Sequence, residues 1–194
     1  MKAETLQSLL ESIRACRICA DHLPLGPNPV LRADISARIL IVGQAPGTKV
    51  HATGIPWNDP SGERLRSWMQ VDKATFYNEN LIAIAPMGFC YPGKGKFGDL
   101  PPRPECAAHW RARLHAQLPN IRLTLLIGQY AMQHYLGHRM KRTLGETVGA
   151  FEEYLPEYFP LVHPSPRNGI WLGKNPWFES SVIPAFRQVL HQVL

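Results

Sequence analysis

Four short apolar segments are spread along the chain, and each of them ends at glycine or proline. They cover residues 38–43 (RILIVG), 80–86 (NLIAIAP), 123–128 (LTLLIG) and 158–164 (YFPLVHP). Continuous apolar runs of this length, without alternating polar residues, are typical of strands that are buried on both faces of a sheet. The pattern therefore predicts four buried strands.

Helical periodicity occupies the segments around these strands. Apolar residues at three- and four-residue spacing predict a first helix, which ends before the loop of residues 16–29, at Leu6, Leu9, Leu10 and Ile13. Further helices are expected over residues 61–69, 103–118, 129–137 and 178–194. Ser61 is a favourable N-cap for the first of these. Alternating strands and helices predict an α/β protein: a three-layer α/β/α fold with a central four-stranded, mainly parallel sheet.

The carboxyl ends of the predicted strands carry unusual chemistry. In parallel sheets the ligand crevice lies outside these ends. Here the strands run into GQAPG (43–47), APMGFC (85–90), GQY (128–130) and HPSPRN (163–168). The segment from Tyr91 to Pro104 is long and irregular, as expected of a surface loop with function or mobility. We therefore expect the functional site at this edge of the sheet.

Composition limits the classes of protein that the chain can represent. Its 194 residues, 45% of them hydrophobic, suffice for one domain over residues 1–194. Lys and Arg (21) outnumber Asp and Glu (15), for a formal net charge of +6, which favours a polyanionic partner or an acidic ligand. The first residues mix charges with leucines, unlike a secretory signal, and no segment reaches the ~18–20 apolar residues of a membrane span. We expect a cytoplasmic monomer without a membrane partner.

Four cysteines form a spacing pattern that suggests a metal site. Cys16 and Cys19 make a C-x2-C pair, and Cys90 and Cys106 lie farther along the chain. Disulfides rarely persist in the reducing cytoplasm. Four thiols are the number that a [4Fe–4S] cluster or a tetrahedral zinc site requires. Simple burial of four small apolar side chains is the alternative.

Three further features stand at or near the predicted sheet edge. Gly43 and Gly47 allow backbone angles and close approaches that side chains forbid, so that main-chain N–H groups would face a ligand; an ordinary turn is the alternative. His163 would donate a hydrogen bond to a developing oxyanion, or bond a nearby carbonyl. Trp57 offers a large aromatic face for a ligand or for the core. The loop matches neither the dinucleotide pattern G-x-G-x-x-G nor a P-loop.

Together these features resemble the uracil-DNA glycosylase superfamily. GQAPG (43–47) resembles the first motif of the superfamily, and HPSP (163–166) resembles the second. The four-cysteine spacing is similar to the iron–sulfur branches known as families 4 and 5, in which the cysteines hold a [4Fe–4S] cluster. The resemblance implies a four-stranded parallel sheet between helices, DNA containing a damaged base as the partner, and hydrolysis of the bond between base and sugar.

The resemblance also implies a role for each candidate residue. The first-motif loop borders the pocket that receives a base rotated out of DNA, and its residues are Gly43, Gln44, Ala45, Pro46 and Gly47. Trp57 matches the aromatic residue that stacks on this base. His163 stabilises the leaving base, and Asp59, in a DPSG sequence similar to family 5, stabilises the cationic sugar or activates water. A turn aspartate is the alternative for Asp59, with His51 and Glu63 as substitutes.

The metal and DNA contacts follow from the same resemblance. Cys16, Cys19, Cys90 and Cys106 would hold the [4Fe–4S] cluster, with zinc or no metal as the alternatives. From their expected place around the pocket, the candidates for phosphate contacts are Lys94, Lys96, Arg103 and Arg167, with solvated surface charge as the alternative for each lysine. Trp171 or Leu172 would enter the vacated base stack.

Two positions depart from the family pattern. Ala45 stands where other members carry an acid, as is common in families 4 and 5. Ala85 and Pro86 stand where uracil-specific members carry an asparagine, which implies a wider range of deaminated bases with uracil first. The sequence thus predicts a monofunctional DNA glycosylase of base-excision repair. The alternatives are a catalytically inactive nucleic-acid-binding protein on the same scaffold and an α/β hydrolase or ligand-binding domain that does not act on DNA.

Overall fold

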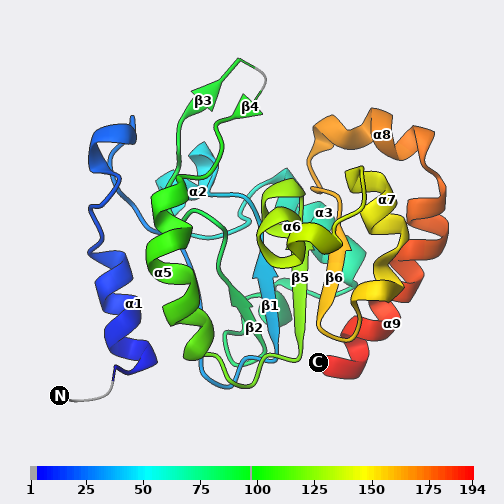
Figure 1. The fold of residues 1–194 in the computed structure, drawn as a ribbon, viewed down its shortest axis with the longest axis horizontal. Coiled ribbons are helices and arrows are strands. Elements are labelled where there is room, and N and C mark those ends of the chain that lie inside the picture. Colours follow the sequence, from blue (N-terminus) through cyan, green and yellow to red (C-terminus); the bar gives the residue numbers. More distant parts are fainter. Residues whose placement is uncertain (1–3, 97) are drawn as a thin grey trace.

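A four-stranded parallel sheet forms the centre of the computed structural model, which describes residues 4–96 and 98–194 (Figure 1). The strands lie in the order β2-β1-β5-β6. Their bounds are β1 Ile39–Val42, β2 Ile82–Ile84, β5 Leu123–Ile127 and β6 Tyr158–Leu161. Every residue of β1, β2 and β5 is buried. The four predicted strands are confirmed, each shorter than its apolar run by one to three residues at one or both ends.

All three ladders of the sheet are parallel. Ile39 in β1 pairs with Ile82 in β2 and with Leu123 in β5, and Thr124 in β5 pairs with Tyr158 in β6. The chain adds β2 on one side of β1 and then β5 on the other side. This reversal is the kind of point at which open α/β sheets bind ligands, beside the carboxyl ends of the strands.

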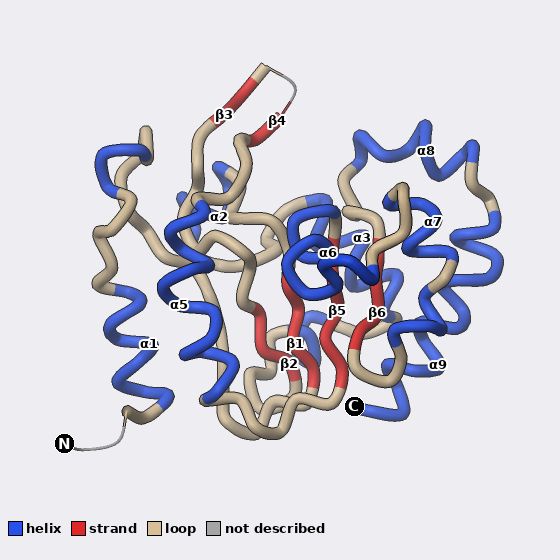
Figure 2. Tube along the Cα trace, in the orientation of Figure 1, coloured by secondary structure: helices blue, strands red, loops and turns tan. Residues whose placement is uncertain are grey.

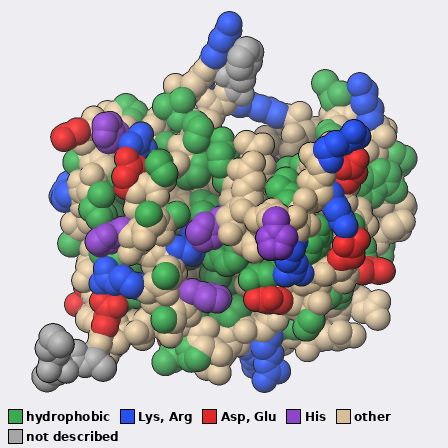
Figure 3. All heavy atoms as spheres, viewed as in Figure 1, with side chains coloured by type: hydrophobic (Ala, Val, Ile, Leu, Met, Phe, Trp, Pro, Cys, Tyr) green, Lys and Arg blue, Asp and Glu red, His purple; other side chains and the backbone are tan. Residues whose placement is uncertain are grey.

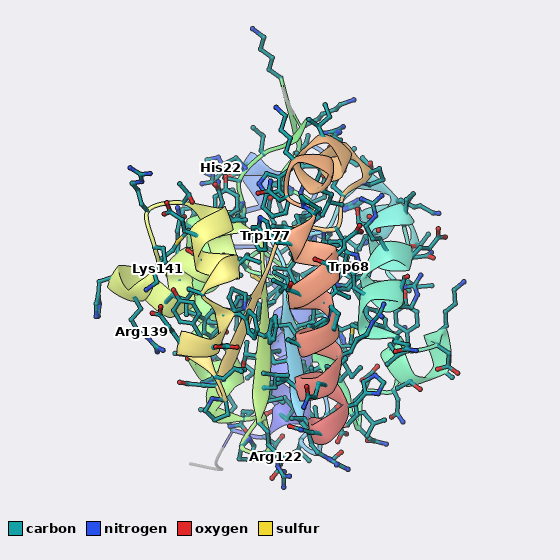
Figure 4. All side chains as sticks on the ribbon, turned by 90° about the vertical axis from the view of Figure 1, so that its right-hand side faces the viewer. His22, Trp68, Arg122, Arg139, Lys141 and Trp177 are labelled. Atoms are coloured by element: carbon teal, nitrogen blue, oxygen red, sulfur yellow. The ribbon has the colours of Figure 1, made fainter. Side chains whose placement is uncertain are left out.

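Helices cover both faces of the sheet, which confirms the predicted three-layer α/β/α architecture. Figure 4 shows α3 (Pro60–Met69) and α9 (Ile183–Val193) on one face, with α6 (Gln129–Leu136) and α7 (Leu144–Gly149) on the other. At the β2 side, α1 (Leu6–Arg14) packs against α5 (Pro104–Ala116) (Figure 1). One cluster of buried hydrophobic side chains joins the sheet to both helical layers.

The predicted helices are present, with ends that differ by a few residues. Ser61 is not the N-cap of α3, because the Asp59 side chain accepts a hydrogen bond from the Gly62 N–H and begins the helix. The C-terminal helical segment opens with a π-helical turn over Phe178–Val182 before α9. Helices without a predicted counterpart are α2 (Thr48–Thr53), α4 (Lys73–Phe76), α7 and α8 (Gly169–Lys174). Within the described residues, no helix combines the length and apolar character needed to span a membrane.

The segment of residues 91–104 is more regular than its composition predicts. It contains a short antiparallel hairpin of β3 (Lys94–Gly95) and β4 (Gly98–Asp99). The Leu100 N–H donates to the Gly93 carbonyl at 2.9 Å and closes the base of the hairpin. Figure 2 shows the hairpin projecting beyond the carboxyl ends of the parallel strands. The expectation of an irregular loop is therefore wrong for the middle of this segment.

Candidate active site

A cavity of about 250 Å³ lies at the carboxyl ends of β1 and β2. The five residues of the loop after β1, 43–47, all line it. Trp57 and Asp59, from the loop before α3, and His163, which follows β6, also line it, although the two segments are about a hundred residues apart. The structure thus brings together in one cavity the residues that the sequence analysis selected for base binding and catalysis.

Two glycines give Trp57 its place in the cavity wall. A Cβ atom on Gly43 would lie 2.9 Å from Cζ2 of the Trp57 ring, and one on Gly62 would lie 1.8 Å from the Trp57 carbonyl oxygen. Trp57 itself has a φ of 56°, in the left-handed region that non-glycine residues rarely adopt. Gly47 has an ordinary φ of −83°. Gly43 is likewise not among the described glycines with a positive φ, so close approach to Trp57, rather than an unusual backbone angle, explains the glycine at position 43.

The strained turn at Trp57 is held from the adjoining helices. The Arg66 guanidinium, on a residue that is only 7% exposed, donates to the Trp57 carbonyl at 3.3 Å. The Tyr77 hydroxyl donates to the Pro56 carbonyl at 2.9 Å. Strained backbone of this kind persists where surrounding contacts over-determine it, commonly at functional sites. The sequence analysis missed both residues, because nothing in the sequence separates Arg66 from a surface arginine.

His163 follows β6, and its ring lies beside the Trp57 ring in the cavity wall. The two ring centroids are 5.6 Å apart, with an angle of 33° between the ring planes. The Asn168 side-chain amide donates to the His163 carbonyl at 2.7 Å and fixes the loop. Burial lowers the pKa of His163 below its ordinary value of 6.5, although the nearby charge of Asp59 opposes this shift. The imidazole is therefore neutral near pH 7 and can donate one ring N–H.

Asp59 lines the cavity and also caps a helix. Its Oδ1 atom accepts a hydrogen bond from the Gly62 N–H at 2.8 Å, which is the N-cap contact of α3. Asp59 therefore has both the turn role that was the alternative and a position in the cavity wall. Neither His51 nor Glu63, both in the described part of the chain, lines this cavity.

Asp99 is a cavity residue that the sequence analysis missed. It ends β4 and lines the cavity together with Arg167. The Gln44 side-chain amide donates to the Leu100 carbonyl at 2.9 Å, which joins the first-motif loop to the hairpin. A second cavity of about 720 Å³ shares Gln44, Asp99 and His163 and extends toward α8. No sequence signal indicated Asp99, because its segment lacks strand periodicity.

The family model of the uracil DNA glycosylase superfamily matches residues 31–187. The chain belongs to this superfamily. The match includes the sheet, both motif loops and the hairpin. The match begins after Cys16 and Cys19, so the superfamily assignment does not depend on the four-cysteine pattern.

The four cysteines of this superfamily member line one small cavity between the N-terminal segment and α5. The Trp110 indole N–H donates to Cys16 Sγ, and the Phe89 main-chain N–H donates to Cys106 Sγ, each at 3.3 Å. Burial raises the pKa of Cys90 to about 11 and that of Cys106 to about 12. Within the described residues, no three His, Cys, Asp or Glu side chains converge as a ready site for a metal ion.

Basic residues border the open side of the cavity at the carboxyl ends of β1 and β2, which is called the base cavity from here on. Lys94 and Lys96 are exposed on the hairpin, and Arg167 is exposed after His163. Figure 3 shows Lys and Arg side chains on the projecting hairpin and on the other side of the same edge. Arg103, in contrast, pairs with Glu105 and lines the cysteine cavity. Of the four residues predicted to contact phosphates, therefore, only Lys94, Lys96 and Arg167 lie on the hairpin or at the same edge of the molecule, which is called the hairpin edge.

The apolar residues that follow the second motif are arranged unequally. The Trp171 ring packs edge-on against Trp177 and Phe178, with both centroid distances at 5.8 Å. Ile170, one residue earlier, is 76% exposed. The exposed apolar side chain of this segment is therefore Ile170, which the sequence analysis did not select, whereas Trp171 and Leu172 are partly buried against the core.

Proposed function

We propose that the chain is a monofunctional DNA glycosylase of base-excision repair, which removes uracil or another deaminated base by hydrolysis. The observation that carries the proposal is the joint lining of one cavity by Trp57, Asp59 and His163. The cavity volume of about 250 Å³ is below the ~300–1,000 Å³ of clefts that take drug-sized ligands. This size suits a single base.

Base flipping accounts for the aromatic wall and the basic edge. A base inside a duplex must leave the stack, at a free-energy cost of about a few kcal/mol, before an enzyme can reach its glycosidic bond. The Trp57 ring would replace part of the lost stacking. Lys94, Lys96 and Arg167 would hold the phosphates of the distorted strand. Ile170, as the exposed apolar side chain beside them, would fill the vacated position in the stack.

Cleavage transfers the electron pair of the glycosidic bond to the departing base. A donor aimed at a carbonyl oxygen of that base stabilises the developing negative charge. His163 suits this role because its depressed pKa leaves a neutral imidazole, which donates an N–H without surrendering the proton. The Asp59 carboxylate would stabilise the positive charge that develops on the sugar.

The floor of the cavity supports a range of bases wider than uracil. Pro86 lines the cavity, and Ala85 is fully buried beside it. Neither has a side-chain donor or acceptor, and Arg111 already donates to the carbonyls of both residues. This wall therefore imposes no side-chain amide pattern on the base. We infer that hypoxanthine or xanthine is accepted beside uracil.

We infer membership of the iron–sulfur branch, families 4 and 5, from the four cysteines that line one cavity, although these side chains, all in the described part of the chain, do not converge as a ready metal site. Cys16, Cys19, Cys90 and Cys106 would hold a [4Fe–4S] cluster, and the N–H groups of Trp110 and Phe89 would stabilise the sulfur charge. The group would cross-link the N-terminal segment to α5 and is not needed for hydrolysis.

Metal analysis tests the cofactor proposal. Protein purified without oxygen is expected to be brown, to contain iron and sulfide, and to lose both in Cys106→Ser. Cys106→Ser is compared with Ser12→Ala, a substitution on α1 outside the cysteine cavity. A colourless protein that contains stoichiometric zinc would overturn the cluster in favour of the tetrahedral alternative.

A strand-cleavage assay tests the catalytic proposal. Single- and double-stranded oligonucleotides carry uracil, hypoxanthine, xanthine or no modification, and alkali then cuts at abasic sites. Removal of one transition-state donor commonly costs about 10²–10³-fold in rate, which is the loss expected for His163→Ala. Trp57→Ala and Asp59→Asn are expected to be slow as well, whereas the unmodified strand stays intact.

Asp72→Asn is the matched control for Asp59→Asn. Asp72 caps α4 by accepting the Thr75 N–H at 2.7 Å, and it does not line the base cavity. Asparagine is also a good N-cap, so neither substitution should remove its helix cap. If every oligonucleotide stays intact while the protein binds DNA, the catalytic proposal fails and the inactive binding protein is supported.

A further inference from the structure

The hairpin brings a second carboxylate to the base cavity. Asp99 lines both the base cavity and the larger cavity beside it. Its Oδ2 atom lies 3.4 Å from the position that a Cβ on Gly47 would occupy, so the carboxylate rests against the first-motif loop. The bond from Gln44 to the Leu100 carbonyl fixes the residue next to Asp99. Side chain and loop are therefore held together at the cavity.

Asp99 lies at the rim of the cavity, where the sugar of a flipped nucleotide would lie, and not at the inner end, where the base would lie. Asp99 is exposed, whereas Gly43 and Pro46 of the same wall are buried. A flipped nucleotide enters with its base innermost, so its sugar and the bond to be cut lie nearer the mouth. Water also reaches the cavity from this side. A carboxylate at the rim is thus placed for the attacking water.

The two cavity carboxylates differ in their hydrogen bonds and charges. Asp59 already accepts the Gly62 N–H as a helix cap. Although Asp99 reaches solvent, the part of its carboxylate that packs against the loop is desolvated, and this partial burial raises its pKa. The charge of Asp59 raises this pKa further, and Arg167 and Lys94 oppose both effects. Tyr91, at the start of the same segment, also interacts with the Asp99 charge. Within the described residues, Asp99 makes no hydrogen bond of this helix-capping kind, and a raised pKa makes a carboxylate a better proton acceptor.

We propose that Asp99 is the general base of the glycosylase reaction, a role that rests on the function proposed above. The water oxygen bonds to the sugar carbon as the carbon–nitrogen bond breaks and its electron pair leaves with the base. The proton lost by the water goes to Asp99. His163 meanwhile donates its hydrogen bond to the base. Asp99 then releases the proton to solvent at the rim, and the base anion takes up a proton from solvent.

Asp99→Asn tests this role in single-turnover cleavage of a uracil oligonucleotide. General-base catalysis contributes about 10²–10⁴-fold, so a rate loss of at least about 10²-fold is expected. The variant removes a negative charge from a basic edge, so its affinity for an uncleavable 2′-fluoro oligonucleotide should equal or exceed that of the wild type. Asp99→Glu should recover part of the rate, and Asp72→Asn should cleave as the wild type does.

The pH dependence separates chemistry from a structural role. The wild-type rate should rise with pH as Asp99 loses its proton, and this rise should be absent in Asp99→Asn. If Asp99→Asn cleaves at the wild-type rate, or loses affinity without losing rate at saturation, the role of Asp99 is overturned and the glycosylase proposal stands. If the wild type cleaves no oligonucleotide, both proposals fall.

Discussion

Trp57 forms a wall of the base cavity because Gly43 and Gly62 leave room for its ring and its carbonyl oxygen. The sequence indicated the first glycine because it directly follows an apolar strand, and the tryptophan because it offers an aromatic face and matches the stacking residue of the superfamily. Gly62 lies one turn into α3 and looked like part of an ordinary helix start. Its importance depends on a contact with a backbone atom, which a single sequence does not encode in any local pattern.

Gly62→Ala should both destabilise the protein and displace Trp57. The added Cβ would lie 1.8 Å from the Trp57 carbonyl, and overpacking of this kind costs about 1–3 kcal/mol. The free energy of unfolding in urea measures the first effect, and cleavage of a uracil oligonucleotide measures the second. Gly173→Ala is the control, because its Cβ meets no atom within 4 Å. Equal stability of the two variants would contradict the crowding described here.

His163 should make the protein less stable in mild acid. Its folded-state pKa is below 6.5, so the unfolded chain binds a proton more readily, and folding stability falls as the pH drops below that value. Urea unfolding at about pH 7.5 and about pH 5.5 measures the difference. His163→Gln should lose less stability between these conditions, whereas His134, also with a lowered pKa, is common to both proteins. An identical loss in both proteins would contradict the burial effect.

The helices and strands differ in how well their sequences predict them. The buried strands were predictable because uninterrupted apolar runs have few other uses in a chain of this composition. The capping box of α7, Thr143 with Glu146, is a helix-start signal that the sequence analysis overlooked. The β3–β4 hairpin could not be predicted in the same way. Its strands have two residues each, and they are held by contacts with the first-motif loop rather than by a hydrophobic pattern.

Helix α5 carries two arginines whose substitutions should differ in cost. Arg111 is 5% exposed and donates to the Ala85 and Pro86 carbonyls, whereas Arg113 pairs with Glu4 at the surface. Arg111→Met leaves the buried Ala85 carbonyl and the part-buried Pro86 carbonyl without this partner, for a loss of about 2–4 kcal/mol. Arg113→Met should cost about 1 kcal/mol or less. Urea unfolding compares them, and similar losses would show that Arg111 does not support the cavity floor.

At the scale of the whole molecule, the location of the site at the sheet edge could be predicted from the sequence. The residues that complete the site from other segments could not. The carboxyl ends of parallel strands meet at one edge, so the residues after β1 and β6 had to lie near one another. Asp99 and Ile170 reach that edge from segments without a recognisable period. The single domain over residues 1–194, the monomeric state and the cytoplasmic location stay predictions.

The basic residues should make DNA binding sensitive to salt at one edge of the molecule only. Lys94 and Lys96 lie on the projecting hairpin, whereas Arg122 precedes β5 at the opposite end of the strands (Figure 4). Each phosphate contact contributes about 0.9 to the slope of log affinity against log salt. The double substitution Lys94→Gln, Lys96→Gln should therefore lower that slope by about 2.

Fluorescence anisotropy with an uncleavable duplex measures this slope. Arg122→Gln should leave the slope at the wild-type value, although it changes the net charge by the same amount as one lysine substitution. If Arg122→Gln lowers the slope as much per charge as the lysine substitutions, binding depends on net charge and the hairpin edge has no special part in it.

The hairpin segment is attached to the rest of the molecule at both ends. It leaves the cysteine cavity after Cys90, passes along the rim of the base cavity at Asp99, and returns to the cysteine cavity at Cys106. A chain tethered at both ends has less conformational freedom than one tethered at a single end. One proteolytic cut after Lys94 would divide this segment into two parts, each attached at one end only, and would leave the buried sheet intact. A nicked protein would thus stay folded, keep its helical spectrum and lose the rim on which the proposed chemistry depends.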